Sequence, residues 1–227
     1  MIADGRLAAA ARSLEAAALA GLAHAALFIV ARVLLLRVPR PDDPAVSQWY
    51  ADADNQRSLI IALNLITIGS IAFVWFVAVI RRRVGQRENR FFGTVFLGSA
   101  MLTVMIWMIG GLLFVTPAVD AYTFGTSQSL QSVSGWQAAG TAAFTIVAPR
   151  LEAVFIISTT TVARLSDAFP RSLVVAGYAA GLVLLFAPLP ISTLSYVFTA
   201  WEISVAGVLL IRRRQLEQQL GEAIPNA

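Results

Sequence analysis

The amino-acid sequence predicts an all-α fold, a polytopic bundle of six transmembrane helices that forms a single domain over residues 1–227. Composition is the first reason, because 58% of the residues are hydrophobic and 13% are charged, against about 25% charged residues in soluble domains. The second reason is a series of apolar runs close to the roughly 20 residues that cross a bilayer. We expect the six spans at about residues 16–36, 59–80, 91–115, 137–163, 172–186 and 191–211.

The first span, about residues 16–36, carries a stripe of small side chains. Ala17, Gly21 and Ala25 recur at every fourth position, and this spacing lets another helix approach closely. The apolar run is too long for the core of a signal peptide, so we expect no cleavage. His24 lies beside the stripe, and two roles are open for it: an interhelical hydrogen bond or the handling of a proton.

The second span, about residues 59–80, contains Asn64 in its outer half, where we predict a hydrogen bond to a neighbouring helix. A polar and acidic loop, residues 37–58, precedes this span. Residues 81–90 follow it and contain five arginines, so the positive-inside rule predicts a cytoplasmic loop. A binding site for lipid headgroups or for a partner is the alternative interpretation of this arginine cluster.

The remaining spans complete the same topology. The third, about residues 91–115, ends before Pro117, and residues 118–136 contain no basic residue, so we expect an external loop there. The fifth, about residues 172–186, is short but carries two glycines at the GxxxG spacing of close helix contacts. The sixth, about residues 191–211, ends in three consecutive arginines. With both termini in the cytoplasm, every arginine-dense segment lies on the inner side of the membrane.

The fourth span is interrupted by Pro149, Arg150 and Glu152 near its centre, where an ionised group costs about 2.5–3.5 kcal/mol on insertion scales. Arg150 and Glu152 are two positions apart and therefore point about 200° apart on a helix, so each needs its own partner. Glu202 lies at a similar depth in the sixth span, and we predict that Arg150 binds it through two parallel hydrogen bonds. Because Pro149 removes a backbone hydrogen bond, we also expect a kink near Thr145.

Glu152 is left to face His24, Asn64 or an aqueous cavity, and two functions are open for this polar midplane. In the first, a channel- or transporter-like protein uses Glu152 as the acceptor of a proton or cation, Arg150 as the counter-charge and Pro149 as a hinge. In the second, the charges form a structural ion-pair network in an accessory or scaffolding subunit of a larger membrane complex, of the envelope transport type. We expect the first. The candidate residues are Arg150, Glu152, Glu202, His24, Asn64 and Pro149.

Missing residue types exclude several kinds of site from this chain. It has no cysteine, one histidine and no lysine, which excludes disulfides, Cys/His metal sites, a two-histidine haem and a retinal Schiff base. The Gly-x-Ser-x-Gly, His-Glu-x-x-His and Walker motifs are also absent from the sequence. We therefore expect no enzyme activity, no cofactor and no metal. Because the arginines cluster at the ends of spans, the expected partner is the lipid bilayer rather than nucleic acid, with a homo-oligomer or other membrane subunits left open.

Residues 69–99 carry a resemblance to other proteins. The sequence from Ser70 to Ser99, SIAFVWFVAVIRRRVGQRENRFFGTVFLGS, resembles a segment of uncharacterised polytopic membrane proteins of actinobacteria. The use of arginine in place of lysine and the many alanines agree with a high-GC genome of that kind. The resemblance implies a multi-helix bundle in the bacterial cytoplasmic membrane, and it brings no activity or ligand.

Overall fold

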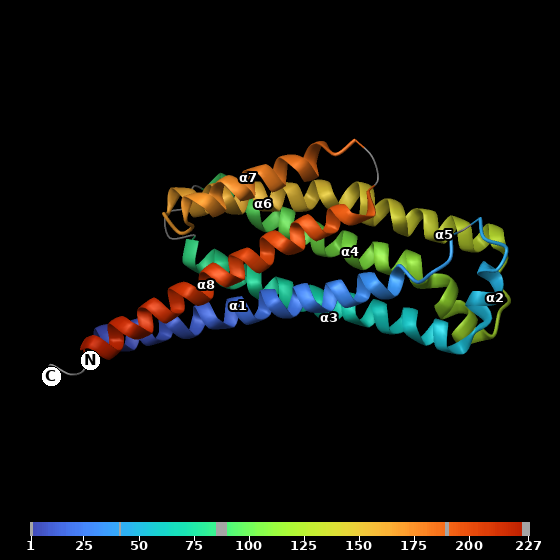
Figure 1. The fold of residues 1–227 in the computed structure, drawn as a ribbon, viewed down its shortest axis with the longest axis horizontal. Helices are drawn as coiled ribbons and strands as arrows, with labels where there is room; N and C mark the ends of the chain where they lie inside the picture. The colour runs from blue at the N-terminus through green and yellow to red at the C-terminus, as the bar shows by residue number, and fades with distance from the viewer. Residues whose placement is uncertain (1, 41, 85–89, 189–190, 224–227) are drawn as a thin grey trace.

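The computed structural model describes residues 2–40, 42–84, 90–188 and 191–223, and the regular secondary structure of these ranges is entirely helical (Figure 1). The elements in chain order are α1 (Ile2–Leu35), α2 (Val46–Ala51), α3 (Ala53–Val84), α4 (Arg90–Phe124), α5 (Leu130–Ala142), η2 (Ala143–Val147), α6 (Ala148–Leu165), α7 (Arg171–Phe186), η3 (Ser192–Leu194) and α8 (Ser195–Ala223). η2 is a turn of π-helix and η3 a turn of 3₁₀-helix. The predicted all-α class is confirmed.

Within the described residues, five stretches of helix are long and apolar enough to cross a membrane, as in a multi-pass membrane protein. They are Ala11–Leu35, Ala53–Arg81, Gly93–Phe124, Leu130–Leu165 and Ser192–Gln218. α7 is apolar but has 16 residues, or about 24 Å of helix, against a hydrocarbon core of about 30 Å. The outer faces are apolar as well, since Ile68, Ile71 and Trp75 of α3 are each more than half exposed. Such faces suit a lipid environment better than water.

Three helices extend furthest beyond their predicted spans. α1 begins at Ile2, well before the predicted start, and α8 continues past the three arginines to Ala223. α4 passes through Pro117 and ends at Phe124, so the predicted end at this proline is wrong. A proline inside a helix removes one backbone hydrogen bond, and packing against neighbouring helices compensates for that loss. The predicted external loop accordingly shrinks to residues 125–129, before α5.

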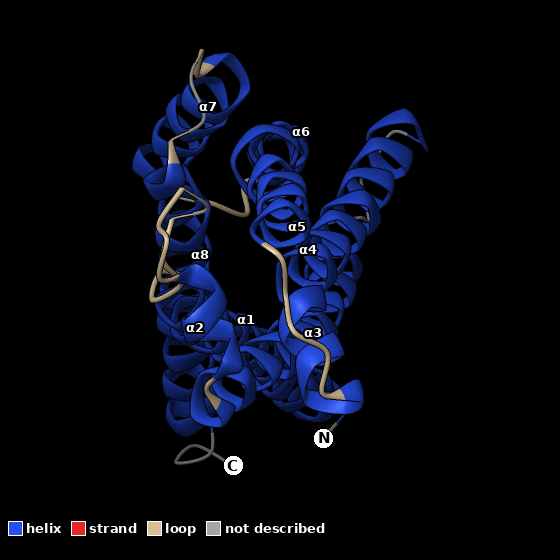
Figure 2. Cartoon of the chain, turned by 90° about the vertical axis from the view of Figure 1, so that its right-hand side faces the viewer, coloured by secondary structure: helices blue, strands red, loops and turns tan. Residues whose placement is uncertain are grey.

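The long helices lie side by side and alternate in direction (Figures 1 and 2). α1 packs against α3 and α8, α4 packs against α3, α5 and α6, and α7 packs mainly against α6 on the outside of the bundle. One end of the bundle holds the start of α1, the end of α8, the end of α3 and the connection between α6 and α7 (Figure 1). Most of the arginines belong to these segments, and we name this the arginine-rich end.

Glycines allow the close helix contacts that the small-residue patterns predict. A Cβ atom on Gly21 of α1 would lie 2.8 Å from the ring of Phe76 in α3. Gly177 and Gly181, the GxxxG pair of α7, lie directly against side chains of α6. Any larger residue at these positions has to push a neighbouring helix away. The close helix approach predicted at the small-residue stripe of α1 and at the GxxxG pair of α7 is therefore confirmed.

Gly140 of α5 offers a test of this packing, because a Cβ atom there would lie 2.7 Å from Cβ of Phe114 and 2.9 Å from the carbonyl oxygen of Gly110 in α4. We expect Gly140→Ala to lower the melting temperature by roughly 2–12 °C, since an overpacked contact costs about 1–3 kcal/mol. Gly135→Ala is the matched control on the same helix, with nothing within 4 Å of its new Cβ atom. Thermal unfolding of the detergent-purified protein compares the two. Equal melting temperatures for both variants would contradict the packing of α4 against α5.

Candidate functional site

Four helices bring an ion pair and a second carboxylate together in the core of the bundle. Nδ1 of His24 in α1 lies 2.7 Å from Oε2 of Glu202 in α8, and both side chains are fully buried. Glu152 of α6 and Trp107 of α4 are equally enclosed. Each of the four lies near the middle of its candidate membrane span. We name these four residues the polar cluster.

Trp107 links the ion pair to the second carboxylate. Its ring stacks on the ring of His24, with centroids 4.8 Å apart and planes inclined by 21°. Its Nε1–H donates a hydrogen bond of 2.8 Å to Oε1 of Glu152. The side chains of the polar cluster therefore form a row across the bundle, from Glu202 through His24 and Trp107 to Glu152. A carboxyl group lies at each end of this row.

Phenylalanine rings surround this arrangement. The ring centroids of Phe28, Phe73 and Phe198 lie 5.4, 5.1 and 6.5 Å from that of His24. All three side chains are buried in the core. Such a shell lowers the local dielectric, which strengthens each hydrogen bond and raises the cost of a charge left without a partner. The shell therefore isolates the polar cluster from the lipid around the bundle.

Arg32 adds a positive charge beside the polar cluster. It follows His24 by eight residues on α1, and its side chain is buried. The guanidinium carbon lies 4.8 Å from the centroid of the Phe144 ring, and one of its nitrogens donates to the carbonyl oxygen of Ser192 at 3.4 Å. Its charge attracts that of Glu152 across the core. Arg32 is therefore a counter-charge for Glu152 when that carboxyl group is ionised.

The polar cluster and Arg32 together need one additional proton to be neutral. Two ionised carboxylates and one guanidinium leave one negative charge, which a proton on His24 or on either carboxyl group cancels. Within the polar cluster, three buried atoms have no hydrogen-bond partner among the described residues: Nε2 of His24, Oε1 of Glu202 and Oε2 of Glu152. Each oxygen of this set can take up a proton without breaking an existing bond. The arrangement is suited to holding a proton and passing it on.

Arg150 lies apart from the polar cluster, and the predicted Arg150–Glu202 pair is wrong. The partly buried side chain of Arg150 donates a hydrogen bond of 2.5 Å to the carbonyl oxygen of Ala187, at the end of α7. Glu202 instead faces α1, where His24 meets it. The reason is rotational, because α6 presents Arg150 to α7 and presents Glu152, about 200° further around the helix, to α4.

Asn64 is also outside the polar cluster. Its side chain is exposed, and Nδ2 donates to the carbonyl oxygen of Ile60 in the same helix at 2.8 Å. The predicted interhelical hydrogen bond is therefore wrong, because a carbonyl one turn earlier already accepts from the amide. Glu152, for which Asn64 was one of three predicted partners, is hydrogen-bonded to Trp107 instead.

The predictions for Pro149 and His24 agree with the structure. The turn before Pro149, Ala143–Val147, is π-helical, which is the form that the predicted distortion takes. Pro149 has no N–H to donate to the carbonyl oxygen of Thr145, so the regular helical pattern is lost there. Of the two roles left open for His24, the interhelical hydrogen bond is present, with Glu202 as its partner.

Trp107 and Arg32 belong to the site but are not among the residues predicted from the sequence. Nothing near Trp107 in the sequence marks its indole as a donor to a carboxylate 45 positions away. Arg32 does carry a signal, since His24, Phe28 and Arg32 are spaced by four residues. That spacing places them along one side of a helix, and an arginine inside a span has to point into the bundle.

Comparisons of the chain with protein-family models, with curated proteins and with solved structures find no match. Within the described part of the chain, no group of three or more His, Cys, Asp or Glu side chains is placed to bind a metal ion.

Proposed function

We propose that the protein is a channel- or transporter-like membrane protein that carries protons through the polar cluster. The observation that supports this most strongly is the complete burial of His24, Glu152 and Glu202 in the middle of helices long enough to cross a membrane. Ionisable side chains inside a membrane are costly and rare, and they typically mark the pathway of an ion or a proton. A single indole ring separates the His24–Glu202 pair from Glu152, so the three groups form one site.

The available ligands favour a proton over a metal cation. A hard cation such as Ca²⁺ takes about 6–8 oxygen ligands, whereas the carboxylate oxygens without a partner in the polar cluster are one on Glu152 and one on Glu202. Trp107 lies between the two residues and offers a donor but no acceptor. A histidine paired with a carboxylate is well suited to proton transfer, because imidazole readily gains and loses a proton near neutral pH.

A hinge in the fourth apolar stretch supports a transport cycle. The π-helical turn η2 and Pro149 lie directly before Glu152 on the same continuous helical stretch. Helices bend at such sites because the regular hydrogen-bond pattern is already interrupted. In our proposal, bending at η2 opens a path for water from one side of the membrane to Glu152, and Arg150 anchors the α6 side of the hinge to the end of α7.

We also propose that α7 is a short additional span, which makes six spans in a bacterial cytoplasmic membrane with both termini inside. The charge distribution supports this topology, because the arginine-rich end is then cytoplasmic. The resemblance of residues 69–99 to membrane proteins of actinobacteria supports the same location.

Cysteine labelling tests this topology without interference, because the chain has no cysteine of its own. Ser127 lies in the loop between α4 and α5, and Gln218 lies near the end of α8; both are exposed. A membrane-impermeant maleimide should label Ser127→Cys in intact cells and Gln218→Cys only after lysis. Labelling of both in intact cells would contradict the proposed number of spans, and the reverse pattern would contradict the orientation.

Proton flux tests the proposed function itself. The assay uses liposomes with a potassium diffusion potential, which drives protons across the membrane, and an internal pH dye, which reports their movement. Liposomes that contain the protein should change their internal pH at least about tenfold faster than empty liposomes. Glu152→Gln should remove about nine-tenths of that rate or more, since the variant cannot carry the transferred proton. Glu217→Gln, which removes an exposed carboxylate of α8, is the matched control and should keep the wild-type rate. Flux that equals that of empty liposomes, or full flux in Glu152→Gln, would overturn the proposal.

A structural role is the second candidate, favoured by the enclosure of the His24–Glu202 pair between α1 and α8. A sealed pair of this kind fixes how two helices dock, and the protein would then be an accessory or scaffolding subunit of a larger membrane complex. The liposome assay separates the two candidates. Protein that folds and is stabilised by the pair but carries no protons supports the structural role.

A further inference from the structure

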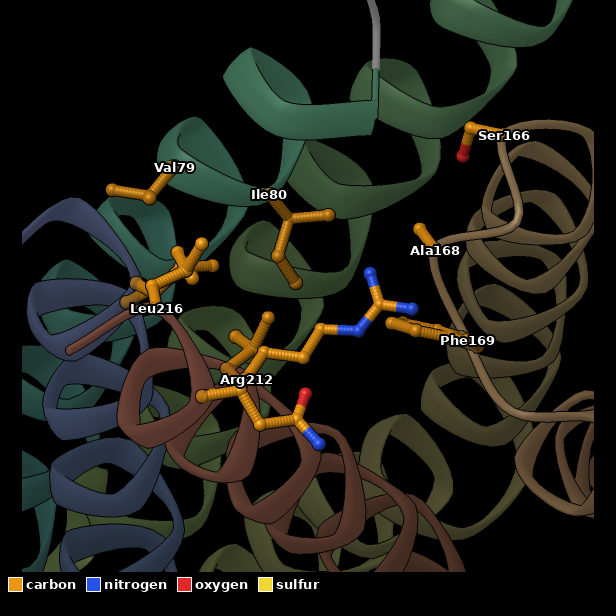
Figure 3. Close-up of a pocket in the computed structure, with 11 residues that line it drawn as sticks. Val79, Ile80, Ser166, Ala168, Phe169, Arg212 and Leu216 are labelled. Atoms are coloured by element: carbon orange, nitrogen blue, oxygen red, sulfur yellow. The ribbon is translucent and has the colours of Figure 1, made fainter. Parts of the chain in front are cut away.

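A pocket of about 460 Å³ lies at the arginine-rich end of the bundle (Figure 3). α1, α3, α8 and the connection between α6 and α7 form its walls. Its volume falls in the range of about 300–1,000 Å³ that is typical of small-molecule sites. None of the four residues of the polar cluster lines it, so the pocket is separate from the proposed proton site.

The walls of the pocket are mostly apolar. Leu14 of α1, Ile80 of α3 and Leu209 of α8 contribute, and Phe169 covers the side formed by the connection between α6 and α7 (Figure 3). Leu14 and Ile80 lie in the terminal turns of their candidate membrane spans. The pocket therefore lies where the hydrocarbon core of a membrane gives way to the headgroups.

One cationic side chain points into this apolar pocket. The guanidinium of Arg212 extends from α8 toward Phe169 (Figure 3). One of its nitrogens donates to the carbonyl oxygen of Asp167 at 3.0 Å, and no carboxylate among the described residues forms an ion pair with it. The next residue, Arg213, has two carboxylate partners, at 2.9 and 3.0 Å. The positive charge of Arg212 is therefore available to an anionic ligand.

We propose that this pocket binds an anionic phospholipid, with the phosphate on Arg212 and the beginning of an acyl chain against Leu14 and Ile80. A guanidinium binds phosphate oxygens through two parallel hydrogen bonds. A free phosphate would leave the apolar walls without a matching surface, and a zwitterionic lipid such as phosphatidylcholine would bring a second cation close to Arg212. The other arginines at this end add a field that attracts an anionic leaflet. A phospholipid with a net negative charge satisfies both parts of the pocket.

Lipid titration of the full chain, purified in detergent and stripped of lipid, tests this proposal. The ligands are phosphatidylglycerol, phosphatidylcholine with the same acyl chains, and glycerol 3-phosphate, which has no acyl chain. Melting temperature reports binding, because a ligand of the folded state raises it. We expect phosphatidylglycerol to half-saturate the protein at about one-tenth of the concentration of phosphatidylcholine. Glycerol 3-phosphate should have no effect at these concentrations.

Three variants locate the site. Arg212→Gln should raise the half-saturating concentration of phosphatidylglycerol about tenfold and abolish its advantage over phosphatidylcholine. Arg214→Gln is the matched control, because Arg214 is exposed on the same turn of α8 and does not line the pocket. Ala168→Leu fills the pocket from the side that faces Arg212 (Figure 3). It should weaken the binding of both phospholipids while the charge of Arg212 is kept.

Specific results would overturn the proposal. Equal affinities for the two phospholipids would remove the role of the charge, and glycerol 3-phosphate that binds as well as phosphatidylglycerol would show a phosphate site without a lipid chain. An Arg212→Gln variant that behaves as Arg214→Gln would place binding elsewhere on the arginine-rich end. If Arg212→Gln does not fold, Ala168→Leu decides, and unchanged binding of phosphatidylglycerol by that variant overturns the proposal.

Discussion

His24→Leu is expected to reduce the free energy of unfolding by about 3–5 kcal/mol, as is typical when one partner of a buried pair is removed. The variant leaves the carboxylate of Glu202 fully buried with no group to balance it, since His24 is its hydrogen-bond partner and phenylalanine rings enclose the site. Protonation of Glu202 reduces this cost but leaves a carboxyl group in an apolar setting. Denaturant titration of the detergent-purified protein, followed by tryptophan fluorescence, measures the loss.

The double variant His24→Leu/Glu202→Leu distinguishes pairing from simple packing. Two leucines in place of a buried ion pair are commonly neutral or stabilising, so the double variant should regain most of the stability that His24→Leu loses. Phe28→Leu is the control, because Phe28 lies one turn further along α1 in the same aromatic shell and makes no polar contact. Phe28→Leu should reduce the free energy of unfolding by about 1 kcal/mol. A double variant no more stable than His24→Leu alone would show that Glu202 is not the partner of His24.

Arg32→Met is expected to reduce the free energy of unfolding by about 2–3 kcal/mol. The substitution removes the positive charge that attracts the ionised form of Glu152, and the neutral indole N–H of Trp107 remains as the hydrogen-bond partner of that carboxyl group. Methionine fills a similar volume, so lost packing contributes little. Arg37→Met changes an exposed arginine two positions beyond the end of α1 and is the matched control.

Rescue by a second substitution tests the coupling of Arg32 to Glu152. Glu152→Gln removes the negative charge that Arg32 balances, and its amide oxygen can still accept from Trp107. The combination Arg32→Met/Glu152→Gln should therefore lower the free energy of unfolding by less than the two single variants do together. The difference should be about 1 kcal/mol or more. Strictly additive losses of stability would mean that the two charges do not interact.

Much of the fold can be predicted from the sequence because membrane spans are local features. The apolar runs and their charged ends depend on consecutive residues, and the predicted spans all coincide with observed helices. The ends of α1, α4 and α8 are predicted less well, because polar and proline-containing turns continue a helix where neighbouring helices support them.

The candidate site can be predicted only in part. His24, Glu152 and Glu202 stand out in the sequence, since each is an ionisable residue within an apolar run, and all three meet in the core. Asn64 looks similar in the sequence but faces outward, because its amide bonds to its own helix. Arg150 is at the right depth but faces α7.

The order of residues along the chain is enough to show that it is helical, apolar over membrane lengths and charged at the ends of its spans, and to identify ionisable residues at mid-depth. These properties follow from composition and from distance along one helix. The packing of the helices determines that Glu202 pairs with His24, that Trp107 donates to Glu152 and that Arg32 is the counter-charge for Glu152. Each of these contacts depends on which helices are neighbours and on the rotation of each helix about its axis. A difference of one residue turns a side chain by about 100°, so depth along a helix cannot decide which partner the side chain meets.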